Sequence, residues 1–322
     1  MARRRQTHTW IYLIWGLNGL VIISLLIAAV FYLTNQRALA ADGLIETPGS
    51  GSTQKPLPTR YFLPTLTPNP FYTPPVFETP TAFVLANGGT HQTIIGYSLA
   101  GRPIEAYAFG EGEREYLIVA GIHGGYEGNT IALANDLITY INENPEVIPD
   151  GTRLYIIRNM NPDGEARSND VDGRVNNNGV DLNRNFPSEN WTADWDRDGC
   201  WILGPTTGGL YAGSEPETRT VMGFITAHKI VALISYHSAA LGVFPGGAPW
   251  EEASKRLAKA LSKETRYPYP PIDTGCEYTG TLADWAVENA VGAAVDMELS
   301  THKNTDFDRN LKALKVLLSF VP

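Results

Sequence analysis

A run of 24 residues without a charged side chain, residues 10–33, most constrains how this 322-residue chain can fold. A helix of that length would extend roughly 36 Å, which is enough to cross a lipid bilayer. Arg3, Arg4 and Arg5 precede the run, and the positive-inside rule places such a basic end in the cytoplasm. We therefore expect residues 1–9 to form a cytoplasmic tail and residues 10–33 to form a single transmembrane helix.

A cleaved signal peptide is the alternative interpretation of this segment. The tripeptide at residues 38–40, Ala-Leu-Ala, is similar to a small-residue cleavage site, and cleavage near Ala40 would release a secreted protein. The apolar run is longer than the roughly 7–15 residues of a typical signal-peptide core, which favours a retained membrane anchor. Under both interpretations the rest of the chain lies outside the cytoplasmic membrane.

Residues 34–81 are expected to form an extracytoplasmic linker. Nine of the 22 prolines fall between residues 47 and 81, and threonine recurs beside them. This composition favours extended polyproline conformation and cannot bury a core. The sequence therefore confines the globular domain to residues 82–322.

Strand-like and helix-like patterns alternate in residues 82–322. Short apolar runs typical of strands occupy residues 104–109, 116–122, 153–158, 230–236 and 293–299. Helical patterns occupy residues 129–141, the segment opened by Ser214, residues 250–265 and residues 310–320. This alternation predicts an α/β fold with a mixed, mostly parallel sheet and helices on both faces. Two glycines, Gly110 and Gly112, separate the first two runs and favour a hairpin there.

Charge and cysteine content exclude several classes of protein. Residues 1–40 hold four arginines and no acid, so residues 41–322 carry 21 basic and 34 acidic side chains, a net charge of −13. A body this acidic is a poor partner for a phosphate backbone, so we expect no nucleic-acid binding. Two cysteines cannot build a disulfide-dense scaffold or a four-thiolate metal site. The composition does not indicate an oligomeric state.

Metal-binding residue types lie in or directly after three of the predicted strands. His123 and Glu127 follow the second strand, His237 follows the fourth, and Glu298 lies in the last. Ligands of α/β sheets bind at the carboxyl ends of the strands, so these side chains should converge. Two histidines, a glutamate ligand and a carboxylate base suit a catalytic zinc site. Each residue taken alone also has a structural interpretation: a hydrogen-bonded histidine at a strand end, or a buried glutamate paired with an arginine.

Longer motifs give the chain a resemblance to a known family. They include Ile-Gly-Tyr-Ser-Leu-Ala-Gly-Arg-Pro-Ile at residues 95–104, Asn-Pro-Asp-Gly at 161–164, Gly-Arg-Val-Asn-Asn-Asn-Gly-Val-Asp-Leu-Asn-Arg-Asn-Phe-Pro at 173–187 and Ser-Glu-Pro-Glu-Thr at 214–218. With these motifs the globular domain resembles the zinc metallocarboxypeptidases of the carboxypeptidase A type. The form is similar to the short bacterial murein peptide amidases.

This resemblance implies one Zn²⁺ per chain and a role for each matching residue. The implied set is His123, Glu127 and His237 as metal ligands, Glu298 and Arg174 as catalytic residues, and Asn183 and Arg184 as substrate-binding residues. In this scheme Glu298 takes a proton from a zinc-activated water. Arg174 stabilises the oxyanion, and Asn183 with Arg184 binds the terminal carboxylate of the substrate.

The first metal motif departs from the family pattern. It usually reads His-x-x-Glu, whereas Tyr126 occupies the glutamate position here and Glu127 follows it. Gly124 and Gly125 permit a sharp turn that can absorb one extra residue. We therefore expect Glu127, and not the weakly ligating phenol of Tyr126, to be the third ligand. Asp163, in the turn at residues 161–164, is expected to orient a ligand histidine.

Three functions remain open on these grounds. The first is a zinc carboxypeptidase that removes C-terminal residues from peptides outside the membrane. The second is hydrolysis of peptidoglycan stem peptides, for example at a γ-D-glutamyl–diamino-acid bond. The third is a non-catalytic peptide- or wall-binding module, which would require a missing ligand or base.

Two further features concern the loops around the site. Asp194, Asp196 and Asp198 match the start of a calcium loop, but Pro205 stands where the loop needs a glutamate, so an aspartate-rich turn is the default. Cys200 and Cys276 are both expected in loops on the substrate side of the domain. An oxidising compartment favours a disulfide between them over two separate thiols.

Overall fold

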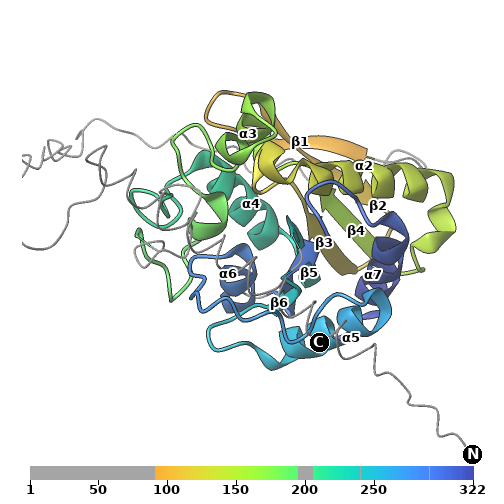
Figure 1. Ribbon diagram of the computed structural model, residues 1–322. Coiled ribbons are helices and arrows are strands. Elements are labelled where there is room, and N and C mark those ends of the chain that lie inside the picture. The colour runs from red at the N-terminus through yellow and green to blue at the C-terminus, as the bar shows by residue number, and fades with distance from the viewer. Residues whose placement is uncertain (1–90, 195–205, 240, 290) are drawn as a thin grey trace, which may run out of the picture. The chain divides into compact units, whose positions relative to one another are not determined.

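The computed structural model describes residues 91–322, with gaps at 195–205, 240 and 290 (Figure 1). All of these residues belong to the unit Val76–Pro322. The predicted cytoplasmic tail, transmembrane helix and linker, residues 1–81, therefore lie outside the described residues. Within the described ranges, no helix combines the length and the apolar character needed to cross a membrane.

The described part of the chain is built on one seven-stranded sheet. Its strands are β1 (His91–Tyr97), β2 (Pro103–Phe109), β3 (Arg114–Val119), β4 (Thr152–Ile157), β5 (Ile230–Ser238), β6 (Val243–Pro245) and β7 (Ala294–Leu299). Their order across the sheet is β1-β2-β4-β3-β5-β7-β6. The four middle strands β4, β3, β5 and β7 run parallel, and the strands at both edges pair antiparallel.

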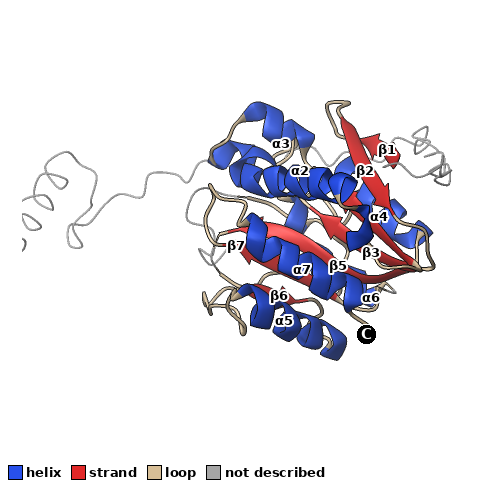
Figure 2. Cartoon of the chain, turned by 90° about the vertical axis from the view of Figure 1, so that its right-hand side faces the viewer, coloured by secondary structure: helices blue, strands red, loops and turns tan. Residues whose placement is uncertain are grey.

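Helices cover both faces of this sheet (Figures 1 and 2). The helices are α2 (Gly128–Glu143), α3 (Pro162–Arg167), α4 (Pro216–Ala227), α5 (Glu252–Thr265), α6 (Leu282–Glu288) and α7 (Phe307–Ser319). Figure 1 shows α2, α5 and α7 on one side of the strands and α4 and α6 on the other. This arrangement leaves the carboxyl ends of the parallel strands free for a site.

The middle strands are buried on both faces because their side chains alternate between two cores. In β3, Tyr116 and Ile118 pack with the α2, α5 and α7 side, whereas Leu117 and Val119 pack with the α4 and α6 side. All four side chains are 0% exposed. A strand buried on both faces reads as a continuous apolar run, which is the pattern in the sequence.

The α/β class and the mixed sheet with helices on both faces are confirmed, with one qualification. Three of the six strand pairings are parallel and three antiparallel, so the sheet is parallel in its middle and not throughout. The hairpin predicted around Gly110 and Gly112 is wrong. Strand β4 lies between β2 and β3, and β2 pairs antiparallel with β4 instead.

The predicted helices are present with small shifts at their ends. Helix α2 covers the predicted residues 129–141, and α5 begins at Glu252. Helix α4 begins at Pro216 with Glu215 as its N-cap residue, although Ser214 was expected to open the helix. Such shifts of one or two residues arise because several residues near a helix end can satisfy the first free backbone amides.

Candidate active site

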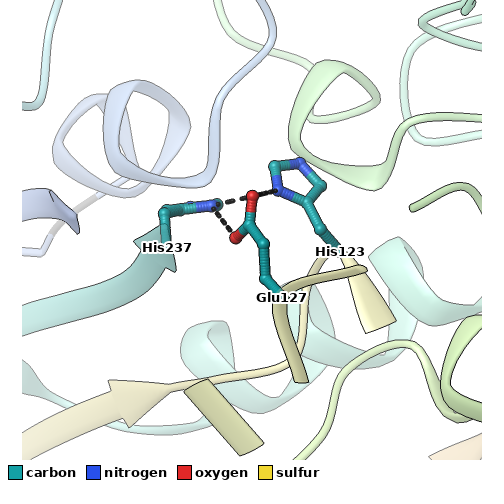
Figure 3. Close-up of side chains that lie close together, drawn as sticks. All are labelled: His123, Glu127 and His237. Atoms are coloured by element: carbon teal, nitrogen blue, oxygen red, sulfur yellow. Dashed lines mark hydrogen bonds and ion pairs between the residues drawn. The ribbon is translucent and has the colours of Figure 1, made fainter. Parts of the chain in front are cut away.

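Three side chains from distant parts of the chain meet at the carboxyl ends of two neighbouring strands. His123 follows β3, Glu127 ends the short 3-10 turn Gly124–Glu127, and His237 lies near the end of β5 (Figure 3). Strands β3 and β5 are parallel neighbours, so their carboxyl ends lie at the same edge of the sheet. The topology therefore brings together residues that are more than a hundred positions apart.

These three side chains form a compact, buried set of possible metal ligands. Glu127 Oε1 lies 2.7 Å from His123 Nδ1, and Glu127 Oε2 lies 3.3 Å from His237 Nδ1. One ligand atom of each residue lies within 4.8 Å of the others. All three residues are buried, with exposed fractions of 2–3%. Two imidazoles and a carboxylate are the protein ligands of many catalytic zinc sites.

The turn between His123 and Glu127 accommodates the extra residue of this motif. Gly124 has φ +46°, and a Cβ on Gly124 would lie 2.7 Å from the Gly173 carbonyl oxygen, so the position favours glycine. Tyr126 is half-buried, and its ring centroid lies 4.8 Å from that of His302, on the cavity wall. The structure thus brings Glu127, and not Tyr126, to the two histidines.

Two carboxylates hold the histidine rings from behind. His123 Nε2 lies 3.1 Å from Asp181 Oδ1. His237 Nε2 lies 3.1 Å from Ser235 Oγ and 3.6 Å from Asp296 Oδ1. A partner on Nε2 fixes the ring orientation and leaves Nδ1 of each histidine facing Glu127. Both rings are thereby prepared to bind a metal through Nδ1.

The electrostatics of the site favour a bound cation. Burial alone would lower the pKa of His237, but the carboxylates of Asp296 and Glu127 outweigh burial and raise that pKa to about 10. Burial alone would raise the pKa of Glu127, but His123 and His237 hold it well below its usual range. The carboxylates around the two histidines therefore favour positive charge at this position. A divalent zinc ion would supply that charge, so the donor set and its charge both fit zinc.

Glu298 lies beside this triad on the next strand. It faces His237 in the register of β5 and β7. Among the described residues, its buried Oε2 has no hydrogen-bond partner. Burial, followed by the nearby Glu127 carboxylate, raises the pKa of Glu298 to about 8. A carboxyl group with a free oxygen and a pKa not far from neutrality is suited to proton transfer to and from water.

Arg174 joins the metal ligands to their supporting carboxylate. Its Nε and Nη2 atoms donate to Asp181 Oδ2 at 3.0 and 2.7 Å. Its Nη1 lies 3.2 Å from His123 Nδ1 and 3.5 Å from Glu127 Oε1. Burial alone would lower the pKa of Arg174, but Asp181 and Glu127 raise it. The guanidinium is therefore a fixed cation at the edge of the site.

Arg184 and Asn183 occupy the same cavity but make different contacts. The Arg184 guanidinium lies 5.0 Å from the ring centroid of Tyr278. Asn183 accepts a hydrogen bond from the Leu282 backbone at 2.8 Å and donates to Asp296 Oδ2 at 3.1 Å. The Asn183 amide thus supports Asp296 behind His237, in addition to lining the cavity.

The site opens into a cavity of about 1050 Å³. Residues from every part of the candidate site line this cavity: His123, Tyr126, Glu127, Arg174, Asn183, Arg184, His237, Tyr278, Asp296, Glu298 and His302. The volume is at the upper end of the range for small-molecule sites. It can hold an extended peptide end with its side chains.

The structure gives Asp163 a different role from the predicted one. Its carboxylate accepts hydrogen bonds from Ser98 Oγ at 2.7 Å, the Ala100 backbone at 2.9 Å and Arg102 Nη1 at 2.7 Å. It therefore holds the turn between β1 and β2, and Asp181 supports His123 instead. The expectation for Asp163 was wrong because it rested on sequence position, which does not show the direction of a side chain.

The remaining predicted residues are only partly described. Asp194 is exposed, whereas Asp196 and Asp198 lie outside the described residues, and the described part of the chain gives no support for calcium. Cys276 is disulfide-bonded and lies on the wall of the cavity. Cys200 lies outside the described residues, so its pairing with Cys276 stays a prediction.

Sequence reasoning missed the two supporting carboxylates, although a signal for each was present. Asp296 lies two positions before Glu298 in β7, and residues i and i+2 of a strand share one face. The register also places Asp296 opposite Ser235 and Glu298 opposite His237. Asp181 immediately precedes the Leu-Asn-Arg-Asn motif at residues 182–185, within a stretch already singled out.

Taken together, the α/β sheet, the buried His–Glu–His set and the adjacent glutamate define a metal-dependent hydrolase. The sequence matches the zinc carboxypeptidase family over residues 88–315. The chain belongs to this family and is a zinc metallopeptidase. The presence of all three ligands and of Glu298, together with family membership, argues against the non-catalytic alternative.

Individual relatives include two different kinds of enzyme. Murein peptide amidase A of Escherichia coli K12 is 32% identical over 204 residues, which cover 60% of this chain and 75% of that protein. Human carboxypeptidase D is 31% identical over 158 residues, 46% of this chain but only 10% of that much longer protein.

Solved structures support the same fold. The murein-tripeptide amidase of Escherichia coli O157 aligns with a TM-score of 0.55 at 23% identity, over 74% of this chain and 94% of that one. Bovine thrombin-activatable fibrinolysis inhibitor aligns with a TM-score of 0.59 at 20% identity, over 72% and 90% of the two chains. Both likenesses concern the fold alone.

Proposed function

We propose that this chain is an extracytoplasmic zinc carboxypeptidase that hydrolyses the C-terminal peptide bond of its substrates. One observation carries the proposal: a His–Glu–His set, a glutamate with a free oxygen and two buried arginines line one cavity. His123, Glu127 and His237 would hold the zinc ion. When bound, zinc would supply Lewis-acid activation of a water molecule near neutral pH.

In this proposal Glu298 carries the proton transfers. Its position opposite His237 places the carboxylate next to the metal ligands, and its unpartnered Oε2 is available to a water molecule. Glu298 takes a proton from the attacking water and then gives it to the departing amine. A bound dication would lower the pKa of Glu298, which would keep the carboxylate ionised for the first transfer.

The two arginines are proposed to bind different negatively charged groups of the substrate. Arg174 contacts the triad through Nη1, so its charge lies where the carbonyl oxygen of the scissile bond becomes negative. Arg184 lies against Tyr278 in the same cavity, where its planar guanidinium can grip both oxygens of a terminal carboxylate. Asn183 is proposed to assist there, and its bond to Asp296 also links carboxylate binding to the orientation of His237.

The N-terminal sequence is the support for the proposed location outside the membrane. Residues 1–33 support a cytoplasmic basic tail and a membrane anchor, and residues 34–81 support a linker that holds the enzyme away from the bilayer. The disulfide at Cys276 is in keeping with an oxidising compartment.

Hydrolysis of peptidoglycan stem peptides is the second candidate function. The 32% identity to a protein named murein peptide amidase A, over three quarters of its length, favours this candidate. An enzyme outside the membrane would also meet such substrates. The same zinc ligands and base would serve both reactions, so the two candidates differ in the peptide that the cavity accepts.

A direct comparison of substrates separates the two candidates. The purified, zinc-loaded full chain would be incubated with L-peptides that end in apolar, basic or acidic residues, and with a murein tripeptide that contains a γ-D-glutamyl–diamino-acid bond. Mass spectrometry would follow the products, with Glu298→Gln as the inactive control. Release of the last residue from ordinary peptides supports the carboxypeptidase, and cleavage of the murein peptide alone supports the amidase.

A further inference from the structure

A second cavity, of about 460 Å³, lies away from the catalytic residues. It is lined by Lys263, Glu264, Thr265, Arg266, Arg309 and Lys312. Four of these six residues are cationic and one is acidic. None of them belongs to the catalytic cavity. The catalytic proposal therefore gives no reason for this concentration of positive charge.

The four cations come from two helices that pack against each other. Lys263 lies in the last turn of α5 and Arg266 caps its end, and cations there interact favourably with the negative end of the helix. Arg309 and Lys312 lie in the first half of α7 (Phe307–Ser319), toward the positive end of that helix. Helix stabilisation accounts for the first pair but not for the second, which lies where its own helix disfavours it.

Arg309 is held in place before any ligand arrives. Its guanidinium lies 4.9 Å from the ring centroid of Tyr267, and Nη1 donates to Ser300 Oγ at 2.6 Å. The Tyr267 hydroxyl donates in turn to Asp306 Oδ2 at 3.0 Å. An arginine whose conformation is already fixed loses little entropy when it binds an anion.

The positive charges of the other three cations are not neutralised by an acidic side chain in the described part of the chain. In the described part of the chain, no carboxylate oxygen lies within 4.0 Å of the charged nitrogens of Lys263, Arg266 or Lys312. Glu264 is the one acid of the lining, and Asp306 Oδ2 lies 3.9 Å from Arg309 Nη1, so the lining together with Asp306 carries a net charge of +2. Residues 41–322 carry −13 overall, so this local excess opposes the charge of the whole domain. Arg309 already has Asp306 as an acidic partner, so a multiply charged anion would chiefly relieve the mutual repulsion of Lys263, Arg266 and Lys312.

We propose that this basic cavity, lined by Lys263, Arg266, Arg309 and Lys312, binds a phosphate-bearing ligand. The planar guanidinium groups of Arg266 and Arg309 match the oxygen pairs of a phosphate group, and the two lysines act as point charges beside them. A free phosphate compound and the headgroup of a phospholipid share this chemistry. The cavity volume, within the usual range for small ligands, accepts either.

Two soluble probes test the site on the zinc-loaded full chain: inorganic pyrophosphate and glycerophosphoglycerol, the headgroup of phosphatidylglycerol. Calorimetric titration measures affinity, and hydrogen–deuterium exchange locates the bound probe. We expect saturable binding of at least one probe, with slower exchange in residues 263–266 and 307–312. Preference for pyrophosphate identifies a free phosphate compound as the ligand, and preference for glycerophosphoglycerol identifies a lipid headgroup.

Charge-reversal variants give the matched control. Lys263→Glu with Lys312→Glu should weaken binding of the preferred probe at least about tenfold, since two of four cations become repulsive. Lys259→Glu with Lys315→Glu, on the same two helices but outside the lining, should leave the affinity within about twofold. Both double variants should keep wild-type peptide hydrolysis, which shows that they fold. Absence of saturable binding, or binding without protection of these residues, would overturn the proposal whatever the outcome of the hydrolysis assay.

Discussion

The Nδ1 atoms of His123 and His237 lie 3.3 Å apart, although 114 positions separate the two residues in the chain. Each ring is held from behind, His123 by Asp181 and His237 by Ser235 and Asp296. Two unprotonated imidazole nitrogens this close would repel each other through their lone pairs, so a proton or a metal cation must lie between or beside them. The Glu127 carboxylate on the same side completes a set of three ligands, and zinc is the ion of this family.

Replacement of the proposed base tests its separation from the metal ligands. Glu298→Gln should lower kcat by about 10²- to 10⁴-fold because the amide cannot accept the proton of the attacking water. Zinc content should stay at the wild-type level, since Glu298 is not a proposed ligand. Steady-state kinetics and metal analysis of the same sample check both statements. Near-normal turnover in this variant would show that another group takes the proton.

Loss of the carboxylate behind His123 should weaken metal binding without removal of a ligand. Asp181→Asn keeps the size of the side chain but weakens its bonds to His123 and Arg174. We expect zinc affinity to fall by about 10- to 100-fold, as measured by competition with a chelator. Asp163→Asn is the matched control, because Asp163 is also buried but holds Ser98 and Arg102. Equal effects of the two substitutions would argue against a specific role for Asp181.

Arg184 should act on substrate binding more than on the chemical step. Arg184→Lys keeps the charge but loses the two parallel hydrogen bonds that a guanidinium can make to a carboxylate. We expect KM for a peptide with a free C-terminus to rise about tenfold or more, with a smaller change in kcat. The C-terminally amidated peptide provides the comparison. If Arg184→Lys leaves KM for the free acid unchanged, the terminal carboxylate binds elsewhere.

A half-buried carboxylate at the opposite ends of the strands, Glu115, should make stability depend on pH. Burial alone would raise the pKa of Glu115, but hydrogen bonds from His228, Tyr155 and the Lys229 backbone outweigh it and lower that pKa to about 2. A carboxylate with a lowered folded-state pKa stabilises the fold above its unfolded pKa of 4.5, and this stabilisation is lost as the pH falls toward 2.

Glu115→Gln should therefore reduce the free energy of unfolding by about 1–2 kcal/mol at pH 7. The difference between variant and wild type should narrow as the pH falls below 4.5. Thermal unfolding at several pH values measures this, with the exposed neighbour substitution Glu113→Gln as control, expected within about 0.5 kcal/mol of wild type. A difference that stays constant with pH would show that the charge of Glu115 contributes nothing.

The sequence was sufficient to predict five of the seven strands and four of the six α-helices of the described residues, and also the residues that gather at the active edge of the sheet. Strands β1 and β6 and helices α3 and α6 were not predicted. Runs such as residues 230–236 are apolar on both faces, so they predict buried parallel strands with little ambiguity. His123 and His237 follow such strands, and the rule for carboxyl ends then places them together. The extra residue Tyr126 did not prevent the prediction of Glu127 as a ligand, because two glycines precede Tyr126 in the turn.

What the sequence could not supply was the pairing of strands and the direction of polar side chains. The glycines at 110 and 112 suggested a hairpin, yet β4 enters between β2 and β3 through contacts that are distant in sequence. Asp163 and Asp181 are both aspartates in turns next to the site. Only the path of the backbone decides that Asp181 meets His123 while Asp163 meets Ser98.

Zinc content of the purified chain tests the central claim most directly. Elemental analysis after dialysis should give one zinc per chain for the wild type and for Tyr126→Phe, because the phenol hydroxyl is not a proposed ligand. Glu127→Ala should lose zinc and hydrolytic activity together, since it removes the carboxylate that lies between both histidines. Retention of one tightly bound zinc by Glu127→Ala would contradict the account, because another residue would then hold the third ligand position.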